Sequence, residues 1–188
     1  MKTHSVREQL LEHTLVLIRR RGFNGFSYRD LAELVGVKTS SIHYYFPSKD
    51  DLVLEAVREY SARTKERIHG IDASLPPAEQ ARQYLAPLRA GVGTGQACLV
   101  AMLCADVLDL PESIRQVMRD YVRMNEQWLA RLFERAQPLR STPYPVPPEQ
   151  LAKVVYGALQ NSMISGRLFD TSERLEAAAA LLTGVIPA

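Results

Sequence analysis

The sequence predicts an all-α protein of about nine helices. Apolar residues recur at three- and four-residue spacing along most of the chain, and no segment has the alternating pattern of a β-strand. Proline and glycine interrupt the helical pattern and divide it into separate helices. With 188 residues, of which 46% are hydrophobic, the chain can bury a sizeable core as one large domain or two small ones.

Helix caps divide the first 70 residues into three helices and the start of a fourth. The first helix ends at Gly22, where we expect a left-handed C-cap. Ser27 and Asp30 form a capping box before the second helix, which ends at Gly36. The remaining boundaries are a third helix at residues 38–46, stopped by Pro47, and a long fourth helix at residues 49–68, capped by Ser48.

Longer helices follow, and prolines separate them. They are predicted at residues 76–91, 96–110, 111–136, 148–169 and 172–186. The segment 96–110 is apolar on nearly all sides, which predicts a buried helix. Pro87 should kink or split its helix, and Asp170 with Glu173 should cap the last one. Loops are expected at 91–95 and at 138–148, where five of eleven residues are proline.

Composition and charge limit the class of protein. No segment approaches the roughly 18 apolar residues of a membrane span, and the first residues lack a signal peptide's apolar stretch, so we expect a cytoplasmic protein without a membrane partner. Two cysteines are too few for a disulfide scaffold. Residues 1–69 carry 12 Lys/Arg and 9 Asp/Glu, net +3, whereas the remainder carries 11 and 12, net −1. A basic N-terminal part favours contact with a polyanion.

Two short helices joined by a tight turn at Gly36 match the helix-turn-helix plan, in which the second helix enters the DNA major groove. That second helix is residues 38–46, with hydroxyl residues near its start for base edges and aromatic residues later for phosphates. Lys49 follows the Ser48 cap, where the helix N-terminus already attracts an anion. The candidate DNA-binding residues are Ser27, Arg29, Lys38, Thr39, Ser40, Ser41, His43, Tyr44, Tyr45 and Lys49. The alternative is that the tyrosines are partly core and the serines merely solvated.

The stretch "RGFNGFSYRDLAELVGVKTSSIHYYFPSKDDLVLEAV" resembles the DNA-binding signature of the TetR family of transcriptional regulators, over roughly residues 5–57. The family often has lysine and glycine where this chain has Thr39 and Ser40, and tyrosine then histidine where it has His43 and Tyr44. The resemblance implies an all-helical homodimer whose effector usually releases the operator, so repression is expected. We place a DNA-binding domain at 1–48, a connecting helix at 49–69, and an effector-binding and dimerisation domain at 70–188.

The C-terminal part is expected to hold an effector pocket where several helices converge. Its candidate residues are Cys98, Met102, Tyr121, Asn125, Trp128 and Asn161. The region also resembles a TetR subgroup with a Gly-Cys-Leu-type stretch, some of whose members respond to electrophiles or oxidants, although Ala97 stands where that subgroup tends to have glycine. Cys98 and Cys104 lie about 9 Å apart along a helix, too far for a disulfide. Cys98 is either a sensor or a core thiol.

The last two helices carry small residues that let helices approach closely across a two-fold axis. The candidate dimerisation residues are Gly157, Ala158, Ala177 and Ala180. The alternative is that these helices pack only within the chain.

Other classes of protein fit the sequence poorly. The "GVGTG" loop lacks the Gly-Lys-Ser/Thr of a phosphate-binding loop, and Asp106 and Asp109 have no histidine beside them. The four histidines are scattered, so we expect no metal, no cofactor and no enzyme. The sequence predicts a dimeric regulator that binds a palindromic double-stranded DNA operator and is released by a small-molecule or electrophilic effector of unknown identity. The alternative is a helix-turn-helix protein that acts through protein partners or DNA organisation without an effector.

Overall fold

In the computed structural model, residues 5–187 are described, and they form nine α-helices and one 3-10 helix without a β-strand. The all-α prediction is confirmed. No helix in this range is long and apolar enough to span a membrane. The chain divides into two compact units. The first unit contains the chain up to Arg63 together with Ala97–Arg119, and the second contains Thr64–Gln96 and the chain from Asp120 onward.

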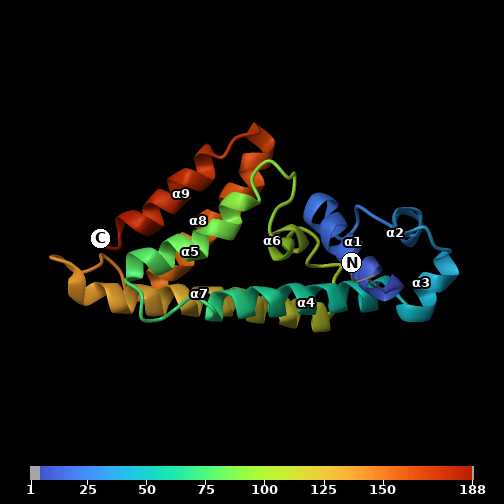
Figure 1. Ribbon diagram of the computed structural model, residues 1–188, viewed down its shortest axis with the longest axis horizontal. Helices are drawn as coiled ribbons and strands as arrows, with labels where there is room; N and C mark the ends of the chain where they lie inside the picture. Colours follow the sequence, from blue (N-terminus) through green and yellow to red (C-terminus); the bar gives the residue numbers. More distant parts are fainter. Residues whose placement is uncertain (1–4, 188) are drawn as a thin grey trace. The chain divides into compact units, whose positions relative to one another are not determined.

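The first unit is built around α1 (Val6–Arg21), which packs against α2 (Tyr28–Val35) and α6 (Leu99–Cys104). The short α3 (Thr39–Tyr45) packs on α2, and α4 (Lys49–His69) begins in this unit (Figure 1). Fully buried side chains from five segments form the core: Leu10, Ile18, Leu31, Ile42, Phe46, Leu52 and Leu99. A core of this kind fixes the short helices by burial, because their own hydrogen bonds are too few.

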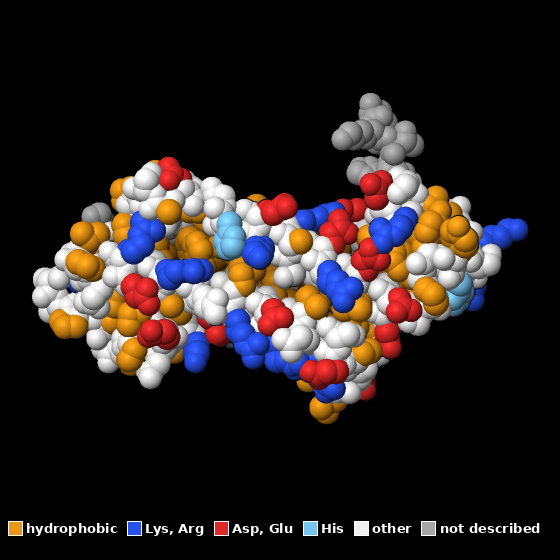
Figure 2. Space-filling model, turned by 90° about the horizontal axis from the view of Figure 1, so that it is seen from below, with side chains coloured by type: hydrophobic (Ala, Val, Ile, Leu, Met, Phe, Trp, Pro, Cys, Tyr) orange, Lys and Arg blue, Asp and Glu red, His pale blue; other side chains and the backbone are white. Residues whose placement is uncertain are grey.

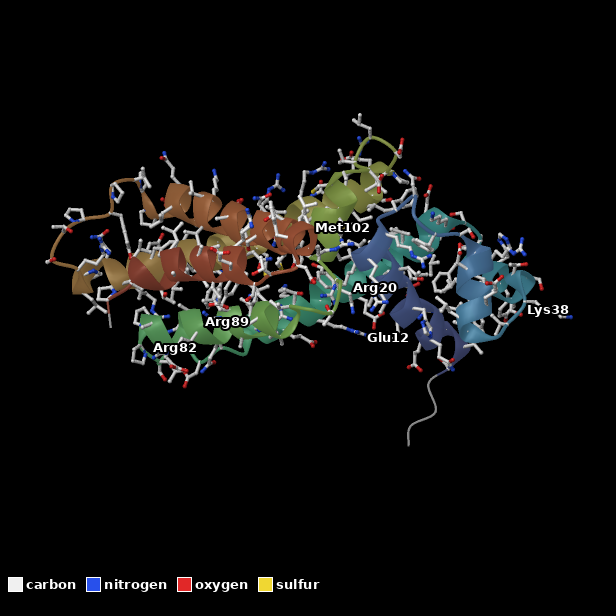
Figure 3. The ribbon with its side chains drawn as sticks, turned by 90° about the horizontal axis from the view of Figure 1, so that it is seen from above. Glu12, Arg20, Lys38, Arg82, Arg89 and Met102 are labelled. Atoms are coloured by element: carbon white, nitrogen blue, oxygen red, sulfur yellow. The ribbon has the colours of Figure 1, made fainter. Side chains whose placement is uncertain are left out.

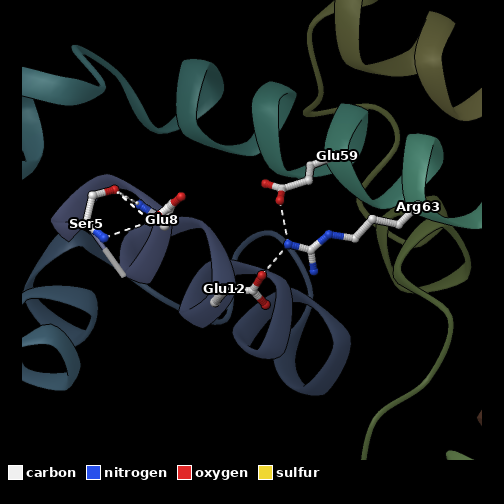
Figure 4. Close-up of polar contacts among 5 residues, drawn as sticks. All are labelled: Ser5, Glu8, Glu12, Glu59 and Arg63. Carbon is white, nitrogen blue, oxygen red and sulfur yellow. Dashed lines mark hydrogen bonds and ion pairs between the residues drawn. The ribbon is translucent and has the colours of Figure 1, made fainter. Parts of the chain in front are cut away.

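Capping boxes begin three of these helices. Ser27 accepts a hydrogen bond from the backbone of Asp30, whose carboxylate accepts one from the Ser27 backbone at 2.7 Å. Ser48 and Asp51 repeat the arrangement at the start of α4. Ser5 and Glu8 do so at the start of α1, as Figure 4 shows. Each box satisfies backbone donors that a helix leaves free at its N-terminus.

Ion pairs join α1 to α4 at the surface. Arg63 donates to both Glu12 and Glu59 (Figure 4), and Arg7 pairs with Glu55. Figure 2 shows one face on which Lys and Arg side chains are interspersed with Asp and Glu. Exposed pairs of this kind contribute little each to stability.

Two glycines hold positive φ angles at the ends of α1 and α2. Gly36 has φ 74° and ψ 34°, which confirms the predicted left-handed C-cap. Gly22 has φ 78° but ψ −174°. Its φ is positive and its ψ is extended, so it does not form the predicted left-handed C-cap. A side chain at Gly22 would also place its Cβ 3.0 Å from Oδ2 of Asp106.

The predicted buried helix at 96–110 is wrong in its extent. Only α6, Leu99–Cys104, is helical, and residues 105–109 are turns with Leu108 91% exposed. The physical reason is that Asp106 and Asp109 bond to the α1–α2 turn, through Phe23 and Asn24, and cannot at the same time continue a helix buried on all sides.

The second unit contains α5 (Pro77–Ala90), α8 (Pro148–Phe169) and α9 (Glu173–Gly184), with most of α7 (Glu112–Ala136) and a 3-10 turn at Gln137–Leu139. In this unit α8 packs along α9, and α5 also contacts α9 (Figure 1). Arg89, labelled on α5 in Figure 3, makes a bidentate ion pair with Glu176 of α9, with Nη2 and Oε2 2.7 Å apart.

One boundary prediction in this unit is wrong, and another is wrong in part. Pro87, which was predicted to kink or split its helix, does not split α5, because only three helical residues follow it and few backbone bonds are lost there. Asp170 does not cap α9. It is instead the left-handed C-cap of α8, with φ 50° and its N–H bonded to the Gly166 carbonyl, while Thr171 Oγ1 accepts from the backbone of Glu173.

Replacing Gly36 with alanine tests the helix-turn-helix turn. A Cβ at this position meets nothing within 4 Å, so the cost is conformational only. We expect Gly36→Ala to lower the free energy of unfolding by about 1 kcal/mol, measured by urea denaturation. Gly36→Asn should lose less, because asparagine tolerates the left-handed region. Equal stability of wild type and Gly36→Ala would contradict the assigned geometry.

Candidate nucleic-acid interface

The recognition helix α3 has one buried and one exposed side. Ile42 and the following Phe46 are buried in the core of the first unit. The opposite side exposes most of the candidate DNA-binding residues: Thr39, Ser40, His43, Tyr44 and Tyr45, with Ser41 partly covered. Tyr44 is 82% exposed and packs its ring edge-on against Tyr45, with centroids 5.1 Å apart. Tyr44 is therefore not a core residue, whereas Tyr45, at 38% exposure, is partly covered.

Lys38 occupies the N-cap of α3 and makes no side-chain cap bond. Its side chain is exposed and projects from the start of α3 in Figure 3. The free N-terminus of α3 and this lysine both favour an anion such as a phosphate.

The N-terminus of α2 carries two further candidates. Ser27 is occupied by its capping box, with its Oγ 2.5 Å from Oδ2 of Asp30. The hydrogen bonds from the Ser27 side chain and backbone hold the pKa of Asp30 below its usual range. Arg29 is exposed and forms a 3.5 Å ion pair with Glu33, one helical turn later. Arg29 is free to exchange this weak pair for a phosphate.

Lys49 is bound inside the protein. Its Nζ donates to the carbonyl oxygens of Phe23 and Phe26, both at 2.6 Å, and lies 4.7 Å and 4.3 Å from the centroids of their rings. Burial lowers the pKa of Lys49, and the carboxylates of Asp106 and Asp50 oppose that shift. Lys49 therefore holds the α1–α2 turn, and a phosphate contact by this lysine remains a prediction.

His43 is fixed by two neighbours. Its Nδ1 lies 3.2 Å from the Pro47 carbonyl oxygen, and its ring meets that of Tyr28 edge-on with centroids 4.8 Å apart. A carbonyl only accepts, so Nδ1 must carry the proton in this contact. Neutral His43 then presents Nε2 as an acceptor, and it donates to a phosphate only when protonated.

Residues 97–109, which include α6, contact the end of α1 and the α1–α2 turn. Oδ2 of Asp106 accepts a hydrogen bond from the Phe23 backbone at 2.9 Å, and Asn24 donates to both Asp106 and Asp109. Ala97 and Arg19 exchange hydrogen bonds at the other end of this segment. No local sequence pattern indicates these contacts, because their partners are about 80 residues apart.

Three candidate effector residues of the second unit lie together around Asn125: Tyr121 and Asn125 are buried, and Trp128 is half-buried. The Tyr84 hydroxyl donates to Oδ1 of Asn125 at 3.0 Å, and Nδ2 of Asn125 donates to the Tyr121 carbonyl at 2.9 Å. Trp128 stacks on Tyr84 with ring centroids 4.8 Å apart. Asn161 lies on the exposed side of α8.

The two remaining effector candidates lie in the first unit, on and beside α6. Cys98 is 3% exposed, and its Sγ is 3.8 Å from the Tyr60 hydroxyl. Met102 is half-buried. Cys104, interpreted from the sequence as a core thiol, is exposed because α6 ends at this residue. Neighbouring atoms still desolvate its thiol, which raises the pKa of Cys104.

The candidate dimerisation residues lie on the outer sides of α8 and α9. Gly157, Ala177 and Ala180 are exposed, and Ala158 is half-buried. Large apolar side chains are exposed on the same two helices: Val154, Ile164, Leu168 and Leu181. We call these eight residues the α8–α9 stripe. Among residues 5–187, no cluster of His, Cys, Asp or Glu could hold a metal ion.

Comparisons with known proteins agree with this architecture. Residues 10–56 match the family model described as bacterial regulatory proteins, tetR family. The chain is 25% identical to the HTH-type transcriptional repressor NemR of Escherichia coli K12, over 97% of this chain and 94% of NemR. It is 31% identical to the regulator RutR of the same organism over 84 residues, which cover 45% of this chain and 35% of RutR.

Solved structures are similar along the whole chain. A TetR-family regulator from Agrobacterium tumefaciens has a TM-score of 0.90 at 27% identity, covering 97% of this chain and 98% of that one. The reduced form of E. coli NemR has a TM-score of 0.79 at 26% identity, covering 98% of both chains. A TetR regulator from Legionella pneumophila, at 24% identity and a TM-score of 0.90 over both full chains, supports the fold alone.

The α2–α3 pair and the matched segment define a helix-turn-helix DNA-binding protein. More specifically, residues 10–56 match the tetR family model, and the chain as a whole is similar in sequence and fold to TetR-family regulators of transcription. The relatives named above are regulators of transcription and not enzymes.

Replacing Lys49 with methionine tests its structural role. Methionine keeps the apolar stem but leaves the Phe23 and Phe26 carbonyls without their donor. We expect the free energy of unfolding in urea to fall by about 1 to 2 kcal/mol. The matched control Lys38→Met, at an exposed lysine, should change it by no more than about 0.5 kcal/mol. A salt dependence of DNA binding reduced by about one unit in Lys49→Met would indicate an additional phosphate contact. Equal stability of the two variants would contradict a stabilising role of Lys49 in the α1–α2 turn.

Proposed function

We propose that this regulator is a cytoplasmic repressor that binds a palindromic operator as a homodimer and is released by an effector. Residues 1–48 bind DNA, residues 49–69 connect, and residues 70–188 bind the effector and dimerise. The observation that carries the proposal is the exposed hydroxyl and aromatic side of α3, opposite the buried Ile42 and Phe46. A helix held in this way can enter a major groove without losing its core contacts.

Contacts to bases and to phosphates are divided along α3. Thr39, Ser40 and Ser41 lie at its N-terminal end, where side chains of recognition helices reach base edges. Tyr44 and Tyr45 supply hydroxyl donors for phosphate oxygens from the later turns. Lys38 and Arg29 add exposed positive charge on either side of the α2–α3 turn. This arrangement supports sequence reading by the start of α3 and positioning by its surroundings.

The α8–α9 stripe supports homodimerisation. One short recognition helix reads only a few base pairs, so two copies are needed for useful specificity. A Cβ added at Gly157 would meet nothing within 4 Å, so the space beside α8 is open in the single chain. Exposed apolar side chains around small residues are typical of a helix surface that packs against another copy.

The cluster around Asn125 supports a reversible small-molecule effector. Small-molecule sites are mostly apolar and carry few polar groups that fix orientation. Tyr84 and Trp128 supply a stacked aromatic face, and Asn125 supplies a buried amide whose bonds a ligand can replace. A regulator without an effector is the alternative, and a ligand screen that never changes operator binding would favour it.

The first experiment combines selection of DNA with measurement of mass. We expect the protein to select palindromic duplexes from a random library and to scatter light as a dimer at micromolar concentration. Ala180→Glu should give a folded monomer with much weaker operator binding, because a charge in the interface would be desolvated. The matched control Ala86→Glu, at an exposed position on α5, should stay dimeric. A monomeric wild type, or selection of non-palindromic sites, would refute the dimer proposal.

A second experiment separates a ligand pocket from a thiol sensor. A thiol reacts only if it is accessible and partly ionised, and Cys98 is buried. We expect N-ethylmaleimide to label the exposed Cys104 slowly, because its pKa is raised, and not to label Cys98, without releasing operator DNA. Mass spectrometry locates the label and a gel-shift assay measures binding. Release of the wild type and of Cys104→Ser, but not of Cys98→Ser, would instead establish Cys98 as the sensor.

A further inference from the structure

The C-terminal end of α3 runs into three consecutive backbone carbonyls that aromatic side chains bind. The Tyr28 hydroxyl lies 2.9 Å from the Phe46 carbonyl oxygen and 2.5 Å from that of Ser48. The carbonyl between them, on Pro47, faces Nδ1 of His43 at 3.2 Å. Tyr28 begins α2, so its hydroxyl joins α2 to both the end of α3 and the start of α4.

The hydroxyl is held in its donor form. Partial burial, together with the nearby carboxylates of Asp51 and Asp50, raises the pKa of Tyr28 to about 12. The phenol therefore stays protonated throughout the physiological range, as a donor to carbonyl oxygens must. The ring itself is fixed edge-on against His43.

At the N-terminal end of α3 no side chain of the described residues is recorded as capping the helix, and the turn before it is joined to α2 by the backbone bond from Val37 to the Ala32 carbonyl, at 3.0 Å. Its N-cap, Lys38, makes no side-chain hydrogen bond to the helix. A seven-residue helix is about 10 Å long, so a small rotation at one end displaces the other by a distance that matters for base contacts. The base-reading residues Thr39, Ser40 and Ser41 stand at this end, which lacks a side-chain cap. Their position is therefore set from the Phe46–Ser48 end and from the buried side of α3.

We propose that Tyr28 is a positioning residue for operator recognition, whose hydroxyl sets the orientation of α3 through the Phe46 and Ser48 carbonyls. Tyr28 need not touch a base to do this. The inference rests on the proposed DNA-binding function of α3. It predicts an effect on discrimination between sequences, because phosphate contacts tolerate a small reorientation that base contacts do not.

Tyr28→Phe removes one hydroxyl and keeps the ring against His43. The probes are a duplex selected by the wild-type protein from a random library and a duplex of the same composition in scrambled order. We expect affinity for the selected duplex to fall about three- to tenfold, as for the loss of one hydrogen bond. Affinity for the scrambled duplex and its salt dependence should stay unchanged. Tyr144→Phe, which removes a hydroxyl in the second unit, is the matched control and should keep full discrimination.

Circular dichroism verifies that both variants are folded at the assay temperature, and hydrogen exchange gives a second readout. Tyr28→Phe should exchange faster at the α3 amides of residues 41–46 and not at those of α1. Equal loss of affinity for both duplexes, or unchanged discrimination with unchanged α3 exchange, would overturn the role of Tyr28. If the wild type itself selects no sequence, the proposed DNA-reading function fails first, so the two failures are distinguishable.

Discussion

A helix of seven residues cannot be stable in water through its own hydrogen bonds, and this constraint governs the whole N-terminal unit. Burial of Ile42 and Phe46 stabilises α3 in place of the hydrogen bonds that so short a helix lacks. Side chains from other helices supply the remainder by binding backbone carbonyls in the turns. Lys49 of α4 binds the α1–α2 turn, and Tyr28 of α2 binds the α3–α4 turn. The α1–α2 turn is therefore held by α4, which follows the α3–α4 turn. The α3–α4 turn is likewise held by α2, which follows the α1–α2 turn.

The same constraint explains why the polar groups around α3 divide into two classes. Some groups are bonded within the protein, as the half-buried Lys49 and the capping Ser27 show. Groups on the outer side, such as Tyr44, are exposed and held only by neighbouring rings. A surface that must meet a polyanion needs donors that are not already committed. The bonded residues therefore hold the shape of the surface proposed to contact DNA, and the exposed residues supply its contacts.

The sequence predicted what is local and missed what is distant. The Ser27–Asp30 box and the Gly36 turn depend on residues within four positions, and their signals were read correctly. The bond from Tyr28 to Ser48 spans 20 residues and leaves no periodic trace. The segment 96–110 was wrongly predicted to be one buried helix, because a short helix followed by an exposed turn can have the same apolar composition. Effector chemistry was out of reach, because the aromatic and amide residues around Asn125 serve a core equally well.

The first compact unit is assembled from two separate stretches of chain, the one ending at Arg63 and the one between Ala97 and Arg119. The later stretch covers part of α1 and caps its final turn through Ala97 and Asp106. The N-terminal helix-turn-helix segment is therefore not a self-contained unit that can be moved between regulators by itself. A chimera that exchanges only the N-terminal segment between two regulators would join α1 to a foreign cover, and donor and recipient would have to match along residues 97–109 as well as at the junction.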